Sequence, residues 1–92
     1  MVFIDAIKPA DAVAQEVATA NKGDIEGKTG KTYGTFDVVS YGTQLVAGTN
    51  YFLKINTGDE HIHARVYKDL GGDYSVHSVQ EGKSADDELA YF

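Results

Sequence analysis

Hydrophobic positions divide the chain into a helical part followed by a β part. Over residues 11–21 (DAVAQEVATAN), apolar side chains recur at steps of three and four, which places them on one face of a helix. Pro9 disfavours helical angles at the residue before it, so we expect the helix to begin just after it, with the first residue of this segment as its N-cap. Gly23 favours an end or a bend, whereas Ile25 continues the apolar stripe toward Gly27.

From Tyr33 onward, β-branched and aromatic residues dominate and the hydrophobic period becomes two, as in strands. Strands are predicted over residues 32–46, 49–57, 60–68 and 74–80, with glycine-containing turns or breaks between them. In the third strand, the alternation predicts that Ile62, Ala64 and Val66 face the core. One helix followed by four or five antiparallel strands is an α+β domain in which the helix covers one face of the sheet.

The composition fits one small domain. A chain of 92 residues has room for no second domain, and its net charge of −6 argues against a nucleic-acid partner. No apolar run approaches the roughly 20 residues of a membrane span, and the amino-terminal MVFIDAIKPA lacks the pattern of a secretory signal. The absence of Cys removes disulfides, Cys-ligated zinc and thiol nucleophiles. We therefore expect a soluble, cytoplasmic protein without a membrane partner.

Few residues could carry chemistry. His61 and His63 share one face of a predicted strand and His77 could lie close, so that zinc or copper binding is conceivable. The two histidines occupy the polar register of an alternating strand, however, which favours a solvated face. The acidic run at residues 86–88 is typical of solvated surface as well. No catalytic residue, metal or cofactor is therefore predicted, and a small metal-binding protein is kept as an alternative.

The segment QLVAG, residues 44–48, is the strongest indication of function. Leu45, Val46 and Ala47 are apolar, yet they fall at the tip of a predicted hairpin, where they would face water. A contact surface for a partner is one interpretation. An ordinary strand end whose apolar residues are buried is the other.

QLVAG resembles the QxVxG signature of the cystatins, which inhibit papain-like cysteine proteases. The continuation TNYFLKI, residues 49–55, resembles the strand that follows this loop in the stefins, the cystatin branch without disulfides or signal peptide. Other stretches resemble stefins in the same order and spacing: KPA (8–10), KTYG (31–34), Gly58 and Asp59, His63, RVYK (65–68) and DDELAYF (86–92). The likeness spans nearly the whole chain.

The resemblance implies a single domain over residues 1–92, in which one long helix is wrapped by a five-stranded antiparallel sheet and residues 1–7 form an extended arm. It also implies a reversible competitive inhibitor, not an enzyme, that inserts a wedge of three elements into the active-site cleft of papain, cathepsins and similar proteases. Carried over position by position, the wedge consists of the arm residues Val2, Phe3 and Ile4, the first hairpin Gln44, Leu45, Val46, Ala47 and Gly48, and the second hairpin Leu70, Gly71, Gly72 and Asp73.

Two of these elements depart from the stefin pattern. Val2 and Phe3 stand where stefins usually have glycine, and the bulkier Phe3 leaves the path of the arm open, including a path back over the sheet. Gly71 stands where a proline usually follows the leucine, and the second hairpin is shorter. A cystatin-fold binding module or scaffold that no longer inhibits proteases is therefore the alternative function.

Asn21 stands on the apolar helix stripe where stefins tend to have an aliphatic residue, so it either weakens the core or marks the edge of the helix.

The protein is expected to be a monomer. Opening of the hairpin at residues 46–48 could exchange halves between two copies, and this domain-swapped dimer would bury the binding loop.

Overall fold

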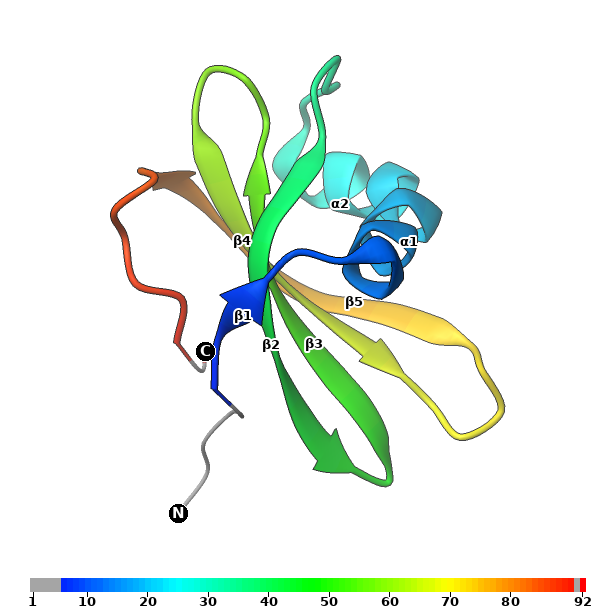
Figure 1. Ribbon diagram of the computed structural model, residues 1–92. Coiled ribbons are helices and arrows are strands. Elements are labelled where there is room, and N and C mark those ends of the chain that lie inside the picture. Colours follow the sequence, from blue (N-terminus) through cyan, green and yellow to red (C-terminus); the bar gives the residue numbers. More distant parts are fainter. Residues whose placement is uncertain (1–5, 91) are drawn as a thin grey trace.

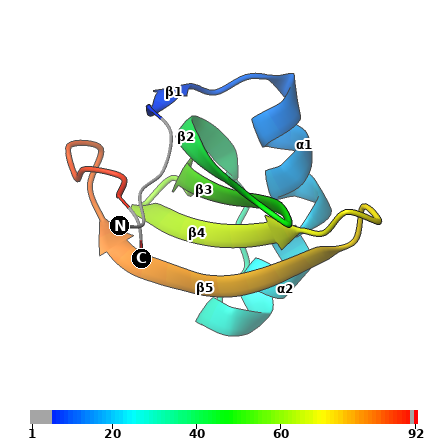
Figure 2. The ribbon, with the colours of Figure 1, turned by 90° about the horizontal axis from the view of Figure 1, so that it is seen from below.

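The computed structural model describes residues 6–90 and 92, which form one five-stranded sheet and two helical segments (Figure 1). The strands are β1 (Lys8–Pro9), β2 (Asp37–Val46), β3 (Gly48–Asn56), β4 (His61–Lys68) and β5 (Tyr74–Lys83), and the helices are α1 (Ala12–Ala20) and α2 (Lys22–Thr29). Strands lie in the sheet in sequence order, and every neighbouring pair is antiparallel. Both helices lie on one side of this sheet, which curves around them (Figure 2). The predicted α+β class is confirmed.

The predicted helix forms, but Asn21 divides it. At its start, the Asp11 carboxylate accepts a hydrogen bond from the Ala14 amide at 2.9 Å, which confirms the predicted N-cap. Asn21 is buried, and its side-chain Nδ2 donates to the Val17 carbonyl at 2.8 Å. The Asn21 carbonyl in turn accepts from the Ile25 amide at 3.0 Å, so that α2 follows directly. The side-chain amide of Asn21 therefore gives the buried Val17 carbonyl a hydrogen-bond partner where the two helices meet, which an aliphatic side chain could not do.

The hydrophobic core lies between the helices and one face of the central strands. Ile62, Ala64 and Val66 of β4 are fully buried, as the alternation predicted. The other buried apolar residues of this cluster come from both helices, the linker and the two preceding strands: Ala14, Val17, Ala18, Ile25, Tyr33, Phe36, Val38, Tyr41, Leu53 and Ile55. Helix α1 packs over β2 and β3, whereas α2 packs over β5.

The opposite face of the sheet is covered by the carboxyl-terminal segment, which makes the predicted solvated position of His63 wrong. His63 is only 1% exposed, and its β3 neighbour Lys54 is 7% exposed. The Lys54 ammonium donates to the carbonyls of Ala85 and, at 2.7 Å, Asp87. Local alternation correctly places His63 away from the core. It could not reveal that a segment more than twenty residues later lies over this face.

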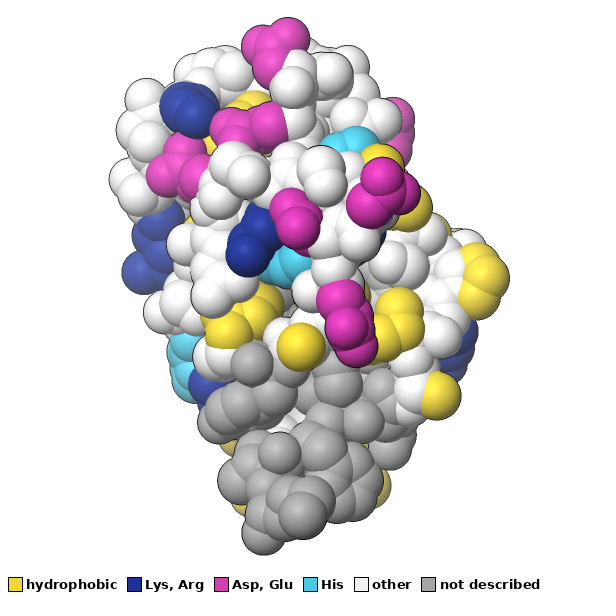
Figure 3. Space-filling view, turned by 90° about the vertical axis from the view of Figure 1, so that its left-hand side faces the viewer, with side chains coloured by type: hydrophobic (Ala, Val, Ile, Leu, Met, Phe, Trp, Pro, Cys, Tyr) yellow, Lys and Arg dark blue, Asp and Glu magenta, His cyan; other side chains and the backbone are white. Residues whose placement is uncertain are grey.

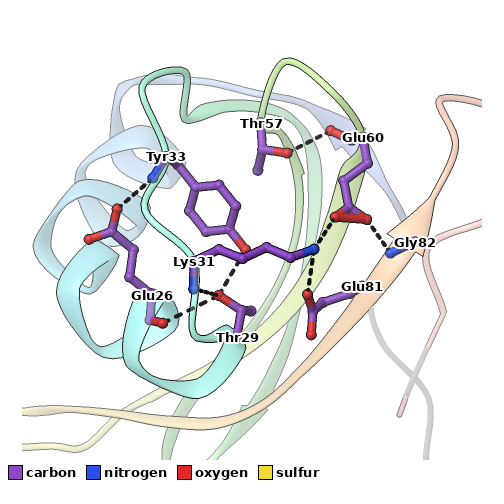
Figure 4. A network of polar contacts seen from close by, with 8 residues as sticks. All are labelled: Glu26, Thr29, Lys31, Tyr33, Thr57, Glu60, Glu81 and Gly82. Atoms are coloured by element: carbon purple, nitrogen blue, oxygen red, sulfur yellow. Dashed lines mark hydrogen bonds and ion pairs between the residues drawn. The ribbon is translucent and has the colours of Figure 1, made fainter.

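A polar network closes the end of the molecule where β3 turns into β4 (Figure 4). The Lys31 ammonium lies 3.0 Å from carboxylate oxygens of both Glu60 and Glu81, and these hydrogen bonds raise the Lys31 pKa. The Tyr33 amide donates to the Glu26 carboxylate at 2.8 Å, and the Tyr33 hydroxyl donates to Thr29 at 2.9 Å. These contacts hold the linker before β2 in a non-strand conformation, so that β2 begins at residue 37 and not at the predicted 32.

Buried His63 should make stability depend on pH. Burial, followed by the nearby ammonium groups of Lys83 and Lys54, lowers the His63 pKa from 6.5 to about 4. Between these values the unfolded chain binds a proton that the folded protein does not, so the free energy of unfolding should fall as the pH is lowered from 6.5 toward 4. The steepest contribution is about 1.4 kcal/mol per pH unit.

Denaturant unfolding at several pH values across this window measures the dependence. His63→Gln removes the ionisable group and should flatten the decline, whereas His77→Gln removes an exposed histidine and is the matched control. Equal pH dependence in the two variants would show that His63 does not cause the decline.

Candidate functional site

The sheet topology brings two hairpins to the same end of the molecule. Because neighbouring strands are antiparallel and follow one another in order, the β2–β3 and β4–β5 connections must lie at one end, and the β3–β4 connection at the other (Figure 1). The structure therefore places the two predicted hairpins of the wedge at the same end of the sheet. The predicted arm, Val2, Phe3 and Ile4, lies outside the described residues.

The first hairpin presents its apolar residues to solvent. Leu45 is 81% exposed and Val46 is 47% exposed. Leu45 pairs with Thr49 and Val46 pairs with Gly48, so that Ala47 alone forms the tip. The alternative in which these residues are a buried strand end is thus wrong. Apolar side chains exposed together at a loop tip have no folding function and are typical of a contact surface.

Gln44 lies within the hairpin and braces it. The Asn50 side-chain Nδ2 donates to Gln44 Oε1 at 2.9 Å across the two paired strands. Gln44 is half-buried, unlike the two residues that follow it. Its amide thus contributes to the shape of the hairpin, while Leu45 and Val46 supply the exposed surface.

Gly48 starts β3 in a conformation that other residues rarely adopt. Its φ is +104°, and a Cβ placed on it would lie 2.7 Å from the Tyr67 hydroxyl and closer still to the Lys68 carbonyl. The Tyr67 hydroxyl also donates to the Ala47 carbonyl. Glycine at this position is therefore required for the packing of this hairpin against β4.

Asn50 and Tyr67 were not among the predicted contact residues. They pair with each other in the β3–β4 register, so that Asn50 lies in the first hairpin itself and Tyr67 on the neighbouring strand. Their spacing of seventeen residues carries no local signal, and only the antiparallel register places them beside the hairpin tip.

The second hairpin is a short loop closed by Asp69. The Asp69 carbonyl accepts from the Gly72 amide at 3.0 Å, and its carboxylate accepts from the Asp73 amide at 2.9 Å. Leu70 is 84% exposed at the tip, and Gly71 and Gly72 beside it are exposed too. Leu70 and Leu45 are the two most exposed large apolar side chains of the described chain, and each lies on one of the two hairpins.

The histidines do not assemble into a metal site. On β5, the residues paired with His61 and His63 are Lys83 and Gln80, whereas the His77 ring lies beside Tyr67 with centroids 5.7 Å apart. The expectation that His77 could lie near the other two is therefore wrong. Within residues 6–90 and 92, no group of three or more His, Cys, Asp or Glu is arranged to hold a metal ion.

The surface also bears on the class of partner. Acidic side chains are spread over the face drawn in Figure 3, and cations do not gather there into a patch. No helix in the described part of the chain is long and apolar enough to cross a membrane.

The hairpin end presents two preformed apolar tips, a shape suited to a concave partner.

Comparison with known proteins identifies this architecture. Residues 3–85 match the family model of the cystatin domain. The chain is 43% identical over 89 residues to Cystatin-A2 of Dictyostelium discoideum, covering 97% of this chain and 94% of that protein. It is 44% identical over 93 residues to Cystatin-B of Oplegnathus fasciatus (97% and 93% covered) and 43% identical over 89 residues to Cystatin-A of Homo sapiens (92% and 91% covered). With its five-stranded antiparallel sheet packed on a helical layer, the chain belongs to the cystatin family.

Proposed function

We propose that this protein is a reversible competitive inhibitor of papain-like cysteine proteases and that its two hairpin tips enter the active-site cleft. Membership of the cystatin family supports the activity. The observation that carries the placement is the exposure of Leu45 and Leu70 on neighbouring hairpins at one end of the sheet. On the face of the sheet opposite the helices, Lys54 and Arg65 donate to backbone carbonyls of the carboxyl-terminal segment, which lies over that face.

Apolar tips can occupy a cleft tightly without chemistry. Removing a leucine or valine side chain from water stabilises a complex by about 1.5–3 kcal/mol when burial is complete. Both hairpins are held by internal hydrogen bonds, so little conformational entropy is lost on binding. Occupation of the cleft excludes substrate, and the absence of a covalent bond makes the inhibition reversible.

The first hairpin should also resist cleavage by the enzyme that it blocks. A catalytic thiolate attacks a peptide bond presented in an extended, aligned geometry about 3–3.5 Å away. The turn at Ala47 and the φ of +104° at Gly48 hold the backbone away from that geometry. A rigid turn therefore favours tight binding and also protects the inhibitor from cleavage by the bound protease.

The proposed contact residues carry different parts of this function. Leu45 and Val46 fill apolar subsites, while Ala47 and Gly48 let the backbone approach the wall of the cleft. Leu70, with Gly71 and Gly72, forms the second contact. The likeness to stefins supports Val2, Phe3 and Ile4 as the third contact, with Phe3 larger than the glycine that stefins usually place there.

The form that we propose as active is a cytoplasmic monomer. Stefins are the intracellular branch of the family, and this chain resembles them over nearly its whole length. In a domain-swapped dimer, residues 46–48 would continue as an extended strand and the apolar tip would be lost. Monomer isolated by size exclusion is therefore the species to assay.

Val46→Asp should weaken inhibition of papain by about 100-fold or more, because it places a carboxylate where an apolar side chain enters the cleft. Val39→Asp is the matched control, since Val39 is 44% exposed on the same strand but lies away from the tip, whereas Val46 is 47% exposed. Inhibition constants measured with a fluorogenic peptide substrate compare the variants. Equal constants would place the contact away from the tip of the first hairpin, whereas no inhibition by the wild-type protein would favour a cystatin-fold scaffold without inhibitory activity.

Gly48→Ala should destabilise the first hairpin and weaken inhibition, because a Cβ at this position meets the Lys68 carbonyl and the Tyr67 ring. Gly58→Ala is a matched control for backbone strain, since Gly58 has a similar φ of +97° at the opposite end of the sheet, where an added Cβ would make only ordinary contacts with Thr35 at 3.6 Å or more. Denaturant unfolding and papain titration of both variants measure the difference. A loss in Gly58→Ala as large as that in Gly48→Ala would mean that the close packing of Gly48 has no special importance.

A further inference from the structure

Among the described strands, the tip of the first hairpin is supported from one side. Strand β1 pairs with β2 at Tyr41 and Ser40, so β2 beyond this point has β3 as its sole paired neighbour among the described strands. At the tip, the next strand in the sheet is β4, whose Lys68 pairs with Thr49. The position of the exposed tip thus depends on what β4 contributes.

Tyr67 of β4 makes that contribution. Its hydroxyl donates to the carbonyl of Ala47, the single residue between the two strands of the hairpin. The hydroxyl and the adjacent ring carbon would lie 2.7 Å and 2.9 Å from a Cβ on Gly48, so the tyrosine ring lies directly against the start of β3. On its other side, the Tyr67 ring lies beside His77 of β5, with the rings inclined by 31°. The tyrosine is therefore held between β5 and the tip.

We propose that Tyr67 is a positioning residue for inhibition: its hydroxyl fixes the Ala47 carbonyl and holds the hairpin tip in its binding conformation before a protease is met. The proposal rests on the proposed function of the tip. Gln44 and Asn50 brace the hairpin within its own two strands, whereas Tyr67 ties the hairpin to the rest of the sheet.

A positioning residue of this kind has a distinct kinetic signature. Without the hydroxyl, only a fraction of free molecules presents a competent tip, and association with the protease slows by that fraction. Once bound, the tip is held by the walls of the cleft, so dissociation should change little. A direct contact between the hydroxyl and the protease would do the reverse, because losing such a contact mainly accelerates dissociation.

Tyr67→Phe tests the proposal because it keeps the ring and removes only the hydroxyl. Tyr33→Phe is the matched control, since the Tyr33 hydroxyl also donates one hydrogen bond, to Thr29 at 2.9 Å, but at the opposite end of the molecule. Association and dissociation rate constants with papain are measured for both variants, along with amide hydrogen exchange at residues 45–49 of the free proteins.

Tyr67→Phe should associate about 3- to 10-fold more slowly, dissociate within about twofold of the wild-type rate, and exchange faster at the tip amides. Tyr33→Phe should change none of these. Unaltered association and exchange in Tyr67→Phe would overturn the proposal, and so would faster dissociation with unaltered association. A wild-type protein that does not inhibit papain would refute the proposed function, while the exchange comparison would still decide whether Tyr67 holds the tip.

Discussion

Pairing between β3 and β4 supports both faces of the sheet and both hairpins. One face of this pair supplies five fully buried core residues, Leu53, Ile55, Ile62, Ala64 and Val66, against the helices. The other face carries Lys54 and His63 beneath the carboxyl-terminal segment. Because the two strands are antiparallel, the hairpins at their outer ends share one end of the sheet. A slip of one residue in this register would exchange the two faces and remove Tyr67 from beside Gly48.

The two ends of the molecule are stabilised by different interactions. Where β3 turns into β4, Lys31 bridges Glu60 and Glu81 and holds the linker that leads into β2. The hairpin end has apolar, exposed tips instead. The first is fixed by the hydrogen bond between the side-chain amides of Asn50 and Gln44, and the second by hydrogen bonds to the carbonyl and carboxylate of Asp69. The proposed contact itself presents apolar side chains, which lose little on leaving water.

The sequence predicted those parts of the structure that depend on local pattern. The three- and four-residue spacing predicted the helix, with Asp11 as its cap, and the alternation of Ile62, Ala64 and Val66 predicted the core face of β4. The glycine-containing turns placed both hairpins, and the apolar QLVAG segment is indeed exposed at Leu45 and Val46. These features depend on residues close together in the chain.

What the sequence could not show depends on partners far away in the chain. His63 has the alternation of a solvated residue, yet the segment that contains Ala85 and Asp87 covers its face. Asn21 is a polar residue on an apolar stripe, and only the structure shows that its side-chain amide donates a hydrogen bond to the Val17 carbonyl. The support that Tyr67 gives to Ala47 likewise arises from the register of β3 against β4 and not from any motif.

Titration of active papain with the isolated monomer tests most directly whether the hairpin end is an inhibitory surface. We expect enzyme activity to fall linearly to zero at one inhibitor per active site and to return when the complex is diluted, with the inhibitor chain recovered intact. A folded monomer that leaves papain fully active at micromolar concentration would contradict this. The cystatin fold would then present its two apolar tips to a different kind of partner.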